Sequence, residues 1–294
     1  LDTDRPTVNV THTLPNPTNQ SPIPITITFS EDVIGMQLTD LLIENGTASS
    51  LLGSGNIYTA QITPTGNGIV RLRLGYGSVM DAAANAIETS SYYTWTYDGT
   101  SPTVEITSTA TTFTKTSPIP ITITFSEAVT GLTADDFVVT NATKGILNGS
   151  GNIYTMNITP ISQGNITVNL PAGAAVDATG NTSRAASEFA RWFDSVLPTV
   201  VMDTTATSLV SSGFRVDVRF SEDVTGFTID DIQVTNANKG VFSGADYWYR
   251  FMIYPINNGQ VTVEIPSGVA ADESGNMNTA SSRLEVTYDN IPPT

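Results

Sequence analysis

The sequence predicts an all-β chain of three tandem β-sandwich domains arranged as a rod. One observation is a repeat: Pro-Thr-Val begins at Pro6, Pro102 and Pro198, which stand 96 residues apart (102 − 6 and 198 − 102). Residues 21–31 are identical to residues 117–127, which indicates duplication of one domain. The other observation is that hydrophobic residues alternate with polar ones along short segments of every repeat, as half-buried β-strands require.

The repeat defines the domain boundaries. We expect repeat 1 at residues 1–98, repeat 2 at 99–194, repeat 3 at 195–290, and the start of a further repeat at 291–294. The chain begins and ends in mid-pattern, so we interpret it as a segment of a longer protein. Because the linkers between repeats are short and end at proline, they leave little freedom to swivel, and we expect the domains to stack as a rod.

Each repeat contains about seven strand-like segments, and this number suits a two-sheet sandwich of the immunoglobulin type. Residues 25–29, 58–62 and 70–74 of repeat 1 each place hydrophobic side chains at every second position. Gly, Asn, Pro and Ser separate these segments, and no repeat shows a helical pattern of hydrophobic residues. The chain contains no Cys, so hydrophobic packing rather than a disulfide must hold the two sheets together.

The composition limits the function. Lys and Arg number 12 against 28 Asp and Glu, which gives a net charge of −16. Because nucleic acids and anionic membrane surfaces attract clustered cations, we expect neither as a partner. No apolar run reaches the length of about 18 residues that a membrane span needs, so we expect no membrane insertion. With one His and no Cys there are few groups for a catalytic triad, and we expect no enzymatic activity.

Acidic residues recur at three positions in every repeat. They are the Glu that ends the second strand (Glu31, Glu127, Glu222), the Asp after the sixth strand (Asp81, Asp177, Asp272) and the linker Asp four residues before Pro (Asp2, Asp98, Asp194). In a sandwich of this type, all three reach the rim at which the preceding domain joins. Massed carboxylates repel one another unless a cation lies between them, and hard oxygen ligands in loops suit Ca²⁺ better than a transition metal. The sequence therefore predicts calcium at the domain junctions; the alternative is that these acids only cap turns.

Three further residues join the predicted metal sites. Asp4 is a candidate ligand of the first site. Asn181 and Asn276 follow a tight Gly turn in repeats 2 and 3 and would add an amide oxygen. Repeat 1 lacks that Gly, which leaves the geometry of its loop open.

Repeat 3 departs from the other two on one predicted sheet face. The candidates for partner binding on this face are Trp248, Arg250, Met252 and Tyr254 from the fifth strand, with Arg215 and Arg219 from the second. Exposed aromatic residues and Arg are typical of interfaces, so this face would support self-association or contact a surface glycan or protein. The alternative is sequence drift, with the Arg stems covering the aromatic rings within the domain.

A set of short motifs completes the pattern of repeat 3; repeat 2 matches them closely, and repeat 1 departs at Met36-Gln37 and in its Gly-less turn. In repeat 3 they are residues 220–227 (Phe-Ser-Glu-Asp-Val-Thr-Gly-Phe), 230–231, 234–236, the 272–276 turn, and Tyr288-Asp289 before Pro. With these motifs the whole chain resembles the tandem bacterial Ig-like repeats of large surface adhesins and biofilm-associated proteins. The resemblance implies immunoglobulin-like domains, neighbouring repeats of the same parent protein as partners, an extracellular or bacterial cell-surface location, and often Ca²⁺ at domain junctions.

These inferences predict a structural role. The chain would be a calcium-stiffened spacer or stalk segment of an extracellular bacterial adhesin or surface filament. The alternative is a ligand-binding module that uses the aromatic and Arg face of repeat 3 to hold a glycan or a protein.

Overall fold

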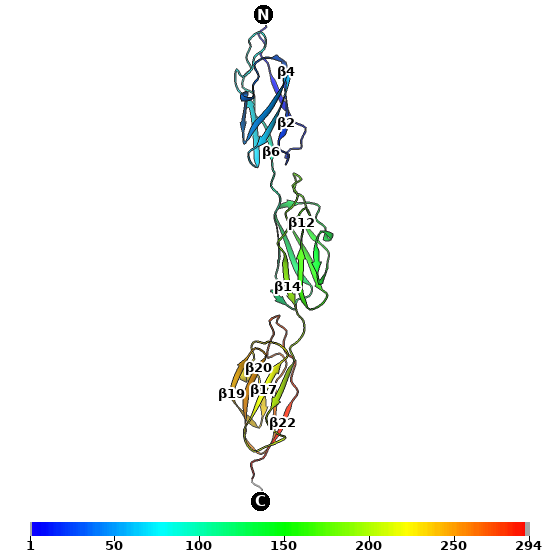
Figure 1. The fold of residues 1–294 in the computed structure, drawn as a ribbon, viewed down its shortest axis with the longest axis vertical. Helices are drawn as coiled ribbons and strands as arrows, with labels where there is room; N and C mark the ends of the chain where they lie inside the picture. Colours follow the sequence, from blue (N-terminus) through cyan, green and yellow to red (C-terminus); the bar gives the residue numbers. More distant parts are fainter. Residues whose placement is uncertain (1, 292–294) are drawn as a thin grey trace.

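Three β-domains lie end to end in the computed structural model, which describes residues 2–291 (Figure 1). The two ends of the chain lie at opposite ends of this elongated arrangement (Figure 1). The only helical segments among the described residues are three 3-10 turns of three residues each, Leu38–Asp40 (η1), Ala134–Asp136 (η2) and Ile229–Asp231 (η3). No helix within residues 2–291 is long and apolar enough to cross a bilayer. The predicted all-β class and the tandem arrangement of three domains are confirmed. The expected start of a further repeat at 291–294 falls outside the described residues except for Ile291.

Repeat 1 is built from six strands in two three-stranded sheets. The strands are β1 (Val8–Thr11), β2 (Ile23–Val33), β3 (Leu41–Glu44), β4 (Gly46–Pro64), β5 (Gly68–Leu74) and β6 (Tyr93–Tyr97). One sheet has the order β1-β2-β4 and the other β3-β5-β6, with all strand pairs antiparallel.

Repeat 2 has eight strands in two four-stranded sheets. The strands are β7 (Val104–Ser108), β8 (Phe113–Thr114), β9 (Ile119–Val129), β10 (Val138–Thr140), β11 (Ala142–Lys144), β12 (Asn148–Pro160), β13 (Gly164–Asn169) and β14 (Phe189–Phe193). The sheet orders are β11-β12-β9-β7 and β10-β13-β14-β8, and the short β8 pairs parallel with β14.

Repeat 3 follows the plan of repeat 2. Its strands are β15 (Val200–Thr204), β16 (Leu209–Val210), β17 (Phe214–Phe220), β18 (Gln233–Thr235), β19 (Ala237–Ala245), β20 (Trp248–Pro255), β21 (Gly259–Glu264) and β22 (Leu284–Tyr288). The sheet orders are β15-β17-β20-β19 and β16-β22-β21-β18. Repeat 1 has fewer strands partly because its counterpart of β8 is reduced to a single parallel bridge between Thr18 and Tyr97.

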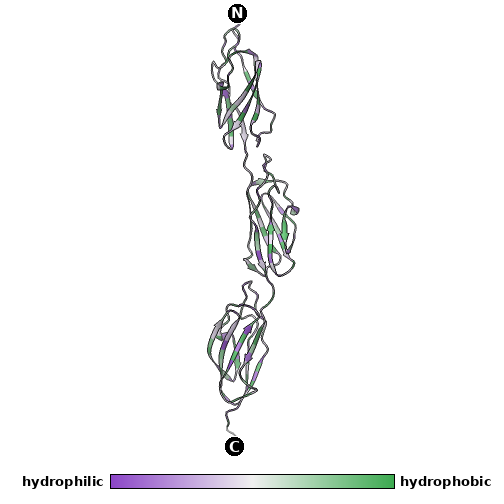
Figure 2. Ribbon diagram, viewed as in Figure 1, coloured by the Kyte–Doolittle hydropathy of each residue, from purple (hydrophilic) through white to green (hydrophobic). Residues whose placement is uncertain are grey.

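Each sandwich has its own hydrophobic core between the two sheets. The alternation predicted for residues 25–29 is present in β2, where Ile25, Ile27 and Phe29 are 2%, 0% and 2% exposed. Figure 2 shows hydrophobic and hydrophilic residues mixed along the strands of every domain, as alternation requires. Burial of these side chains, at about 1.5–3 kcal/mol for each large residue, is the main stabilising contribution in a sandwich without a disulfide.

The loop that follows β5, β13 or β21 is held against the segment that comes after β2, β9 or β17. Isolated bridges join Ile34 to Met80, Thr130 to Val176, and Thr225 to Ala271. β5 ends at Leu74, and Asp81 lies seven residues further along this loop (81 − 74). These bridges fix the segment after each strand and the loop Asp at the same rim of the sandwich.

Candidate metal centres at the domain junctions

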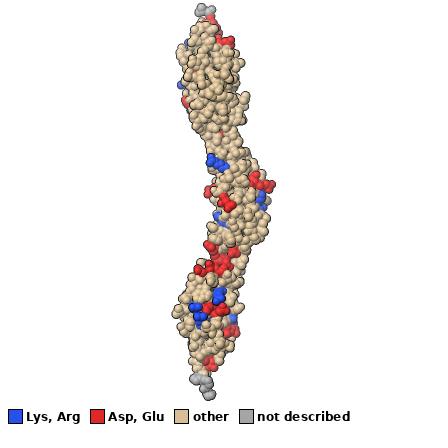
Figure 3. All heavy atoms as spheres, in the orientation of Figure 1, with Lys and Arg blue, Asp and Glu red and all other residues tan. Residues whose placement is uncertain are grey.

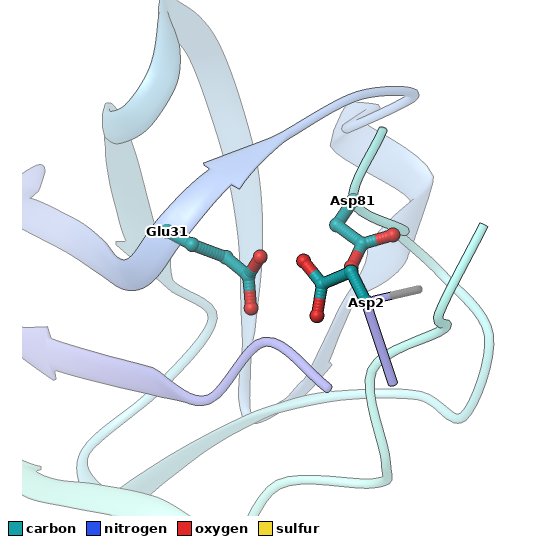
Figure 4. A group of neighbouring side chains, drawn as sticks. All are labelled: Asp2, Glu31 and Asp81. Atoms are coloured by element: carbon teal, nitrogen blue, oxygen red, sulfur yellow. The ribbon is translucent and has the colours of Figure 1, made fainter. Parts of the chain in front are cut away.

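Nine carboxylates form three clusters, one at the rim that begins each repeat. Within each cluster one oxygen from each residue lies within 4.8 Å of the others. The clusters are Asp2, Glu31 and Asp81; Asp98, Glu127 and Asp177; and Asp194, Glu222 and Asp272. Figure 4 shows the first of them, in which the three side chains come from the N-terminal segment, β2 and the loop after β5. The structure thus brings together the three residue positions that the sequence singles out.

The pKa of the Glu side chain is raised in each cluster. Burial raises the pKa of Glu127, and the neighbouring charges of Asp177 and Asp98 raise it further. The pKa values of Glu31 and Glu222 are raised for the same reasons, burial first and then the adjacent aspartates. No Lys or Arg of residues 2–291 forms an ion pair with any of the nine carboxylates. Each cluster therefore concentrates negative charge without a direct ion pair to a Lys or Arg of the described residues.

In the first two clusters, hydrogen bonds lower the pKa of the loop Asp. Burial raises the pKa of Asp177, but the hydrogen bonds from Asn181 and Thr179 outweigh it and leave this pKa below its ordinary value. The backbone N–H groups of Thr179 and Asn181 donate to Asp177 Oδ1 at 2.8 and 2.9 Å. In repeat 1 the hydrogen bond from the Asn85 side chain is the main cause of the lowered pKa of Asp81.

Asn181 and Asn276 lie at the clusters with the amide nitrogen, not the oxygen, toward the carboxylate. Asn181 Nδ2 donates to Asp177 Oδ2 at 2.8 Å and to the backbone oxygen of Asp98 at 3.0 Å. Asn276 Nδ2 makes the same pair of bonds to Asp272 and Asp194, at 2.8 and 3.0 Å. Because two acceptors flank the amide, it serves as a donor and ties the loop to the linker. This differs from the expectation that these residues offer an amide oxygen to an ion.

Asp4 lies beside the first cluster rather than within it. Its backbone N–H donates to Asp2 Oδ1 at 3.1 Å, and its charge contributes to the raised pKa of Glu31. The glycine that repeat 1 lacks is replaced by Ala84, which adopts the left-handed conformation with a φ of 70°; Gly180 and Gly275 have φ of 90° and 82°. The turn is therefore similar in all three repeats, at the cost of backbone strain in the first.

One group of functional residues at the junctions is not predicted by the acidic pattern. Asn67 Oδ1 accepts from the backbone N–H of Gly99 at 3.0 Å, and Gln163 Oε1 accepts from that of Ser195 at 2.9 Å. Asn258 makes the equivalent bond to Asn290 at 3.1 Å. Each side chain fixes the linker to the domain before it. Their spacing of 96 and 95 residues (163 − 67 and 258 − 163) is the signal in the sequence that would have revealed them.

The candidate partner-binding residues of repeat 3 share one sheet face, as the sequence predicts. In the pairing of β17 with β20, Arg215 lies opposite Met252, and Arg219 lies opposite Trp248. The alternate residues of these strands, including Tyr249, point into the core. Arg250 lies over the Trp248 ring at 4.6 Å, and its Nε donates to Asp217 at 2.7 Å.

Within this face, Arg219 and Tyr254 are exposed, whereas Trp248, Met252, Arg215 and Arg250 are half-buried. Arg215 also donates to Asp217, at 3.0 Å. A side chain at Gly213 or Gly240 would collide with the Tyr254 ring, so this ring lies over both glycines. Part of the aromatic surface is therefore covered by the domain itself.

The comparisons with known proteins bear on the family. The family described as "Bacterial Ig-like domain" matches the chain three times, at residues 2–97, 98–191 and 194–288. No curated protein matches the chain. A solved structure titled as invasin, a bacterial integrin-binding protein, is similar with a TM-score of 0.37 and 11% identity; the match covers 97% of this chain and 60% of that one. The chain belongs to the family of bacterial Ig-like domains and carries three of them in tandem.

Proposed function

We propose that this chain is a spacer segment of a bacterial protein at the cell surface or outside the cell, and that Ca²⁺ bound at the domain junctions stiffens it. The observation that carries the proposal is the recurrence of a three-carboxylate cluster at the rim of every repeat. An active site would be needed once, whereas a device that joins domains is needed at each junction. We accordingly propose a structural rather than an enzymatic role.

The donor set fits calcium. Ca²⁺ takes six to eight oxygen ligands at about 2.3–2.6 Å, so ligand oxygens around one ion stand up to about 5 Å apart. The carboxylate oxygens within 4.8 Å of one another meet this requirement without rearrangement. Mg²⁺ binds at about 2.0–2.1 Å, demands near-ideal octahedral geometry and keeps several waters, so it is less suited than Ca²⁺ to a set of loop carboxylates. A bound cation would also relieve the repulsion that raises the pKa of Glu127.

The origin of the ligands supports a stiffening role. At the second cluster, Asp98 comes from the linker, whereas Glu127 and Asp177 belong to repeat 2. The linker is in turn fixed to repeat 1 through Asn67. An ion shared by the three carboxylates would therefore restrain repeat 2 against the linker and, through Asn67, against repeat 1. Extracellular calcium modules bind with dissociation constants of about 10⁻⁴–10⁻³ M, which suits a location outside the cell.

Thermal unfolding and small-angle scattering test the proposal. An ion that binds only the native junction stabilises it by about 2.7 kcal/mol at a hundredfold excess over the dissociation constant. We expect calcium chloride to raise the melting temperature relative to a chelator, and to sharpen the rod-like scattering of the chain. Identical melting curves with and without chelator, together with no calcium heat in calorimetry, would refute it.

A second candidate function is a ligand-binding module on the β17–β20 face of repeat 3. The observation that favours it is a concentration of Arg215, Arg219 and Arg250 in a chain with only 12 basic residues; Figure 3 shows blue side chains gathered on repeat 3. The ligand would be a surface glycan, another protein or a second copy of the chain. A Trp248→Ala, Tyr254→Ala double variant should keep its fold and lose retention on such a ligand or lose self-association. Unchanged behaviour in both assays would leave sequence drift as the explanation.

A further inference from the structure

The junction between repeats 2 and 3 contains a cavity of about 190 Å³ with aromatic and acidic walls. Phe113 and Trp192 of repeat 2 form one side, and they are 36% and 48% exposed. They lie next to each other because β8 pairs with β14 in a register that places Phe113 beside Trp192. The other side is lined by the carboxylates Asp194, Glu222, Asp223, Asp272 and Glu273.

The first junction has the metal cluster but not the rest of this cavity. Counting back 96 residues, Pro17 and Thr96 of repeat 1 stand where repeat 2 has Phe113 and Trp192. Counting back 95 residues, Ala128 and Ala178 stand where repeat 3 has Asp223 and Glu273. Relative to the first junction, these four differences add two aromatic rings and two carboxylates to the second junction. These additions are separate from the cluster that all three repeats share.

The walls define the chemistry of the occupant. Aromatic faces attract cations within about 6 Å of the ring, and carboxylates add charge complementarity. Arg suits both because its planar guanidinium stacks on aromatic rings and pairs with carboxylates through two parallel hydrogen bonds. Repeat 3 already holds one such group internally, where Arg250 lies over Trp248 and pairs with Asp217.

No cation of the described chain takes this place at the junction. Lys115 lies beside the same loop, but its Nζ donates to the backbone oxygen of Gly275. Residues 2–291 contain no ion pair to any of the five carboxylates. Figure 3 shows acidic side chains gathered between repeats 2 and 3 on the face in view. The cavity is smaller than the roughly 300–1,000 Å³ of sites for drug-sized ligands, and its size suits one side chain.

We propose that this cavity binds an arginine side chain presented by a partner protein. The guanidinium stacks on Trp192 or Phe113 and pairs with Asp223 and Glu273, the carboxylates that lie outside the metal cluster. Contacts to repeat 2 through the rings and to repeat 3 through the acids bridge the two domains. Binding at this junction therefore depends on the relative position of repeats 2 and 3, which the proposed calcium site would set.

Calorimetric titration of the whole chain with acetyl-tri-arginine amide tests the proposal. We expect one binding event, and a dissociation constant raised at least tenfold by Trp192→Thr and by the double variant Asp223→Ala, Glu273→Ala. These changes install the residues of the first junction. The matched control Thr96→Ala, at the first-junction counterpart of Trp192, should leave the titration unchanged. Equal affinity of wild type and Trp192→Thr, or no heat up to millimolar peptide, would overturn the proposal.

Two further measurements separate this proposal from the calcium proposal and from other occupants. Both variants should keep the calcium-induced rise in melting temperature, because they retain Asp194, Glu222 and Asp272. If calcium has no effect on any variant but tri-arginine binding still requires Trp192, only the calcium proposal fails. Spermidine binding as tightly as tri-arginine would overturn the assignment to a protein side chain. Self-association of the wild type that Trp192→Thr abolishes would reassign the cavity to a second copy of the chain.

Discussion

Asn181 of repeat 2 donates a hydrogen bond of 3.0 Å to the backbone oxygen of Asp98, in the linker that precedes it. The same amide group donates to Asp177 at 2.8 Å. The side chain thus connects a loop carboxylate of the cluster to the backbone of the linker, with no ion required. Asn85 and Asn276 make the same connection in repeats 1 and 3. This contact sets the position of the linker Asp before any cation binds.

Removing this contact should loosen the first junction. In Asn181→Ala, the Asp177 carboxylate and the Asp98 carbonyl lose a donor, which costs about 1–3 kcal/mol when such groups stay buried. We expect a lower urea midpoint for repeat 2 and a broader distribution of lengths in small-angle scattering. Asn152→Ala, at an exposed position of β12, is the control. Equal midpoints and scattering for Asn181→Ala and wild type would show that the contact contributes nothing to the junction.

Replacing the Glu of a cluster by Gln should affect the melting temperature differently with and without calcium. Glu127→Gln removes a charge that Asp177 and Asp98 repel. Without calcium we therefore expect an unchanged or higher melting temperature, and with calcium we expect a smaller rise than in wild type because one ligand charge is lost. Glu105→Gln, on β7 of the same repeat, controls for net charge. A full calcium response in Glu127→Gln would exclude this Glu as a ligand.

The pH dependence of the calcium-free chain follows from the same groups. The pKa values of Glu31, Glu127 and Glu222 are raised above 4.5 in the folded chain, so the folded state binds more protons than the unfolded state just above that pH. Stability from this source is lost as pH rises through the folded pKa values, and is regained on acidification from about pH 7 to about pH 5. The lowered pKa values of Asp81 and Asp177 act in the opposite direction, and the stability that they contribute is lost as the pH falls below about 5.

Melting temperatures measured with a chelator between about pH 7 and about pH 5 test whether acidification stabilises the calcium-free chain. The triple variant Glu31→Gln, Glu127→Gln, Glu222→Gln should give a flatter profile than the wild type. With calcium present the wild-type profile should reverse, because protons compete with the ion for the carboxylates. A chelated wild type that loses stability between pH 7 and pH 5 would contradict the assignment.

The nine carboxylates were predictable because each lies at a fixed place in a repeat of near-constant length. That the three carboxylates of each repeat meet at one rim follows from the alternating direction of the strands, which brings the ends of the second and sixth strands to the same rim of the sandwich. The role of Asn181 was not predictable in this way, since an amide offers both a donor and an acceptor, and only the positions of Asp177 Oδ2 and the Asp98 carbonyl select the donor. The role of Asn67 was not predictable either, because a polar residue in a turn has many ordinary explanations.

The aromatic wall at the second junction was hidden for a different reason. Phe113 belongs to β8, which has two residues and no alternation for a pattern to detect. Its neighbour Trp192 comes from β14, far along the chain, and the two meet only through parallel pairing. Sequence periodicity identifies which residues face a core, but it does not identify which loop or short strand of one domain faces the next. The face of repeat 3 was predictable because both of its strands are long and alternate regularly.

The turn of repeat 1 offers a test of backbone strain at the first rim. Ala84 has a φ of 70°, where repeats 2 and 3 have Gly180 and Gly275. The left-handed conformation costs a residue with a Cβ about 1–2 kcal/mol, and glycine avoids most of this cost while losing more entropy on folding. We expect Ala84→Gly to stabilise repeat 1 by about 0.5–1 kcal/mol and Gly180→Ala to destabilise repeat 2 by about 1 kcal/mol, measured by urea denaturation. The control is Ala83→Gly, one residue earlier and without a positive φ, which should lower the free energy of unfolding of repeat 1 or leave it unchanged. An increase in stability equal to that of Ala84→Gly would show that the strain argument is wrong.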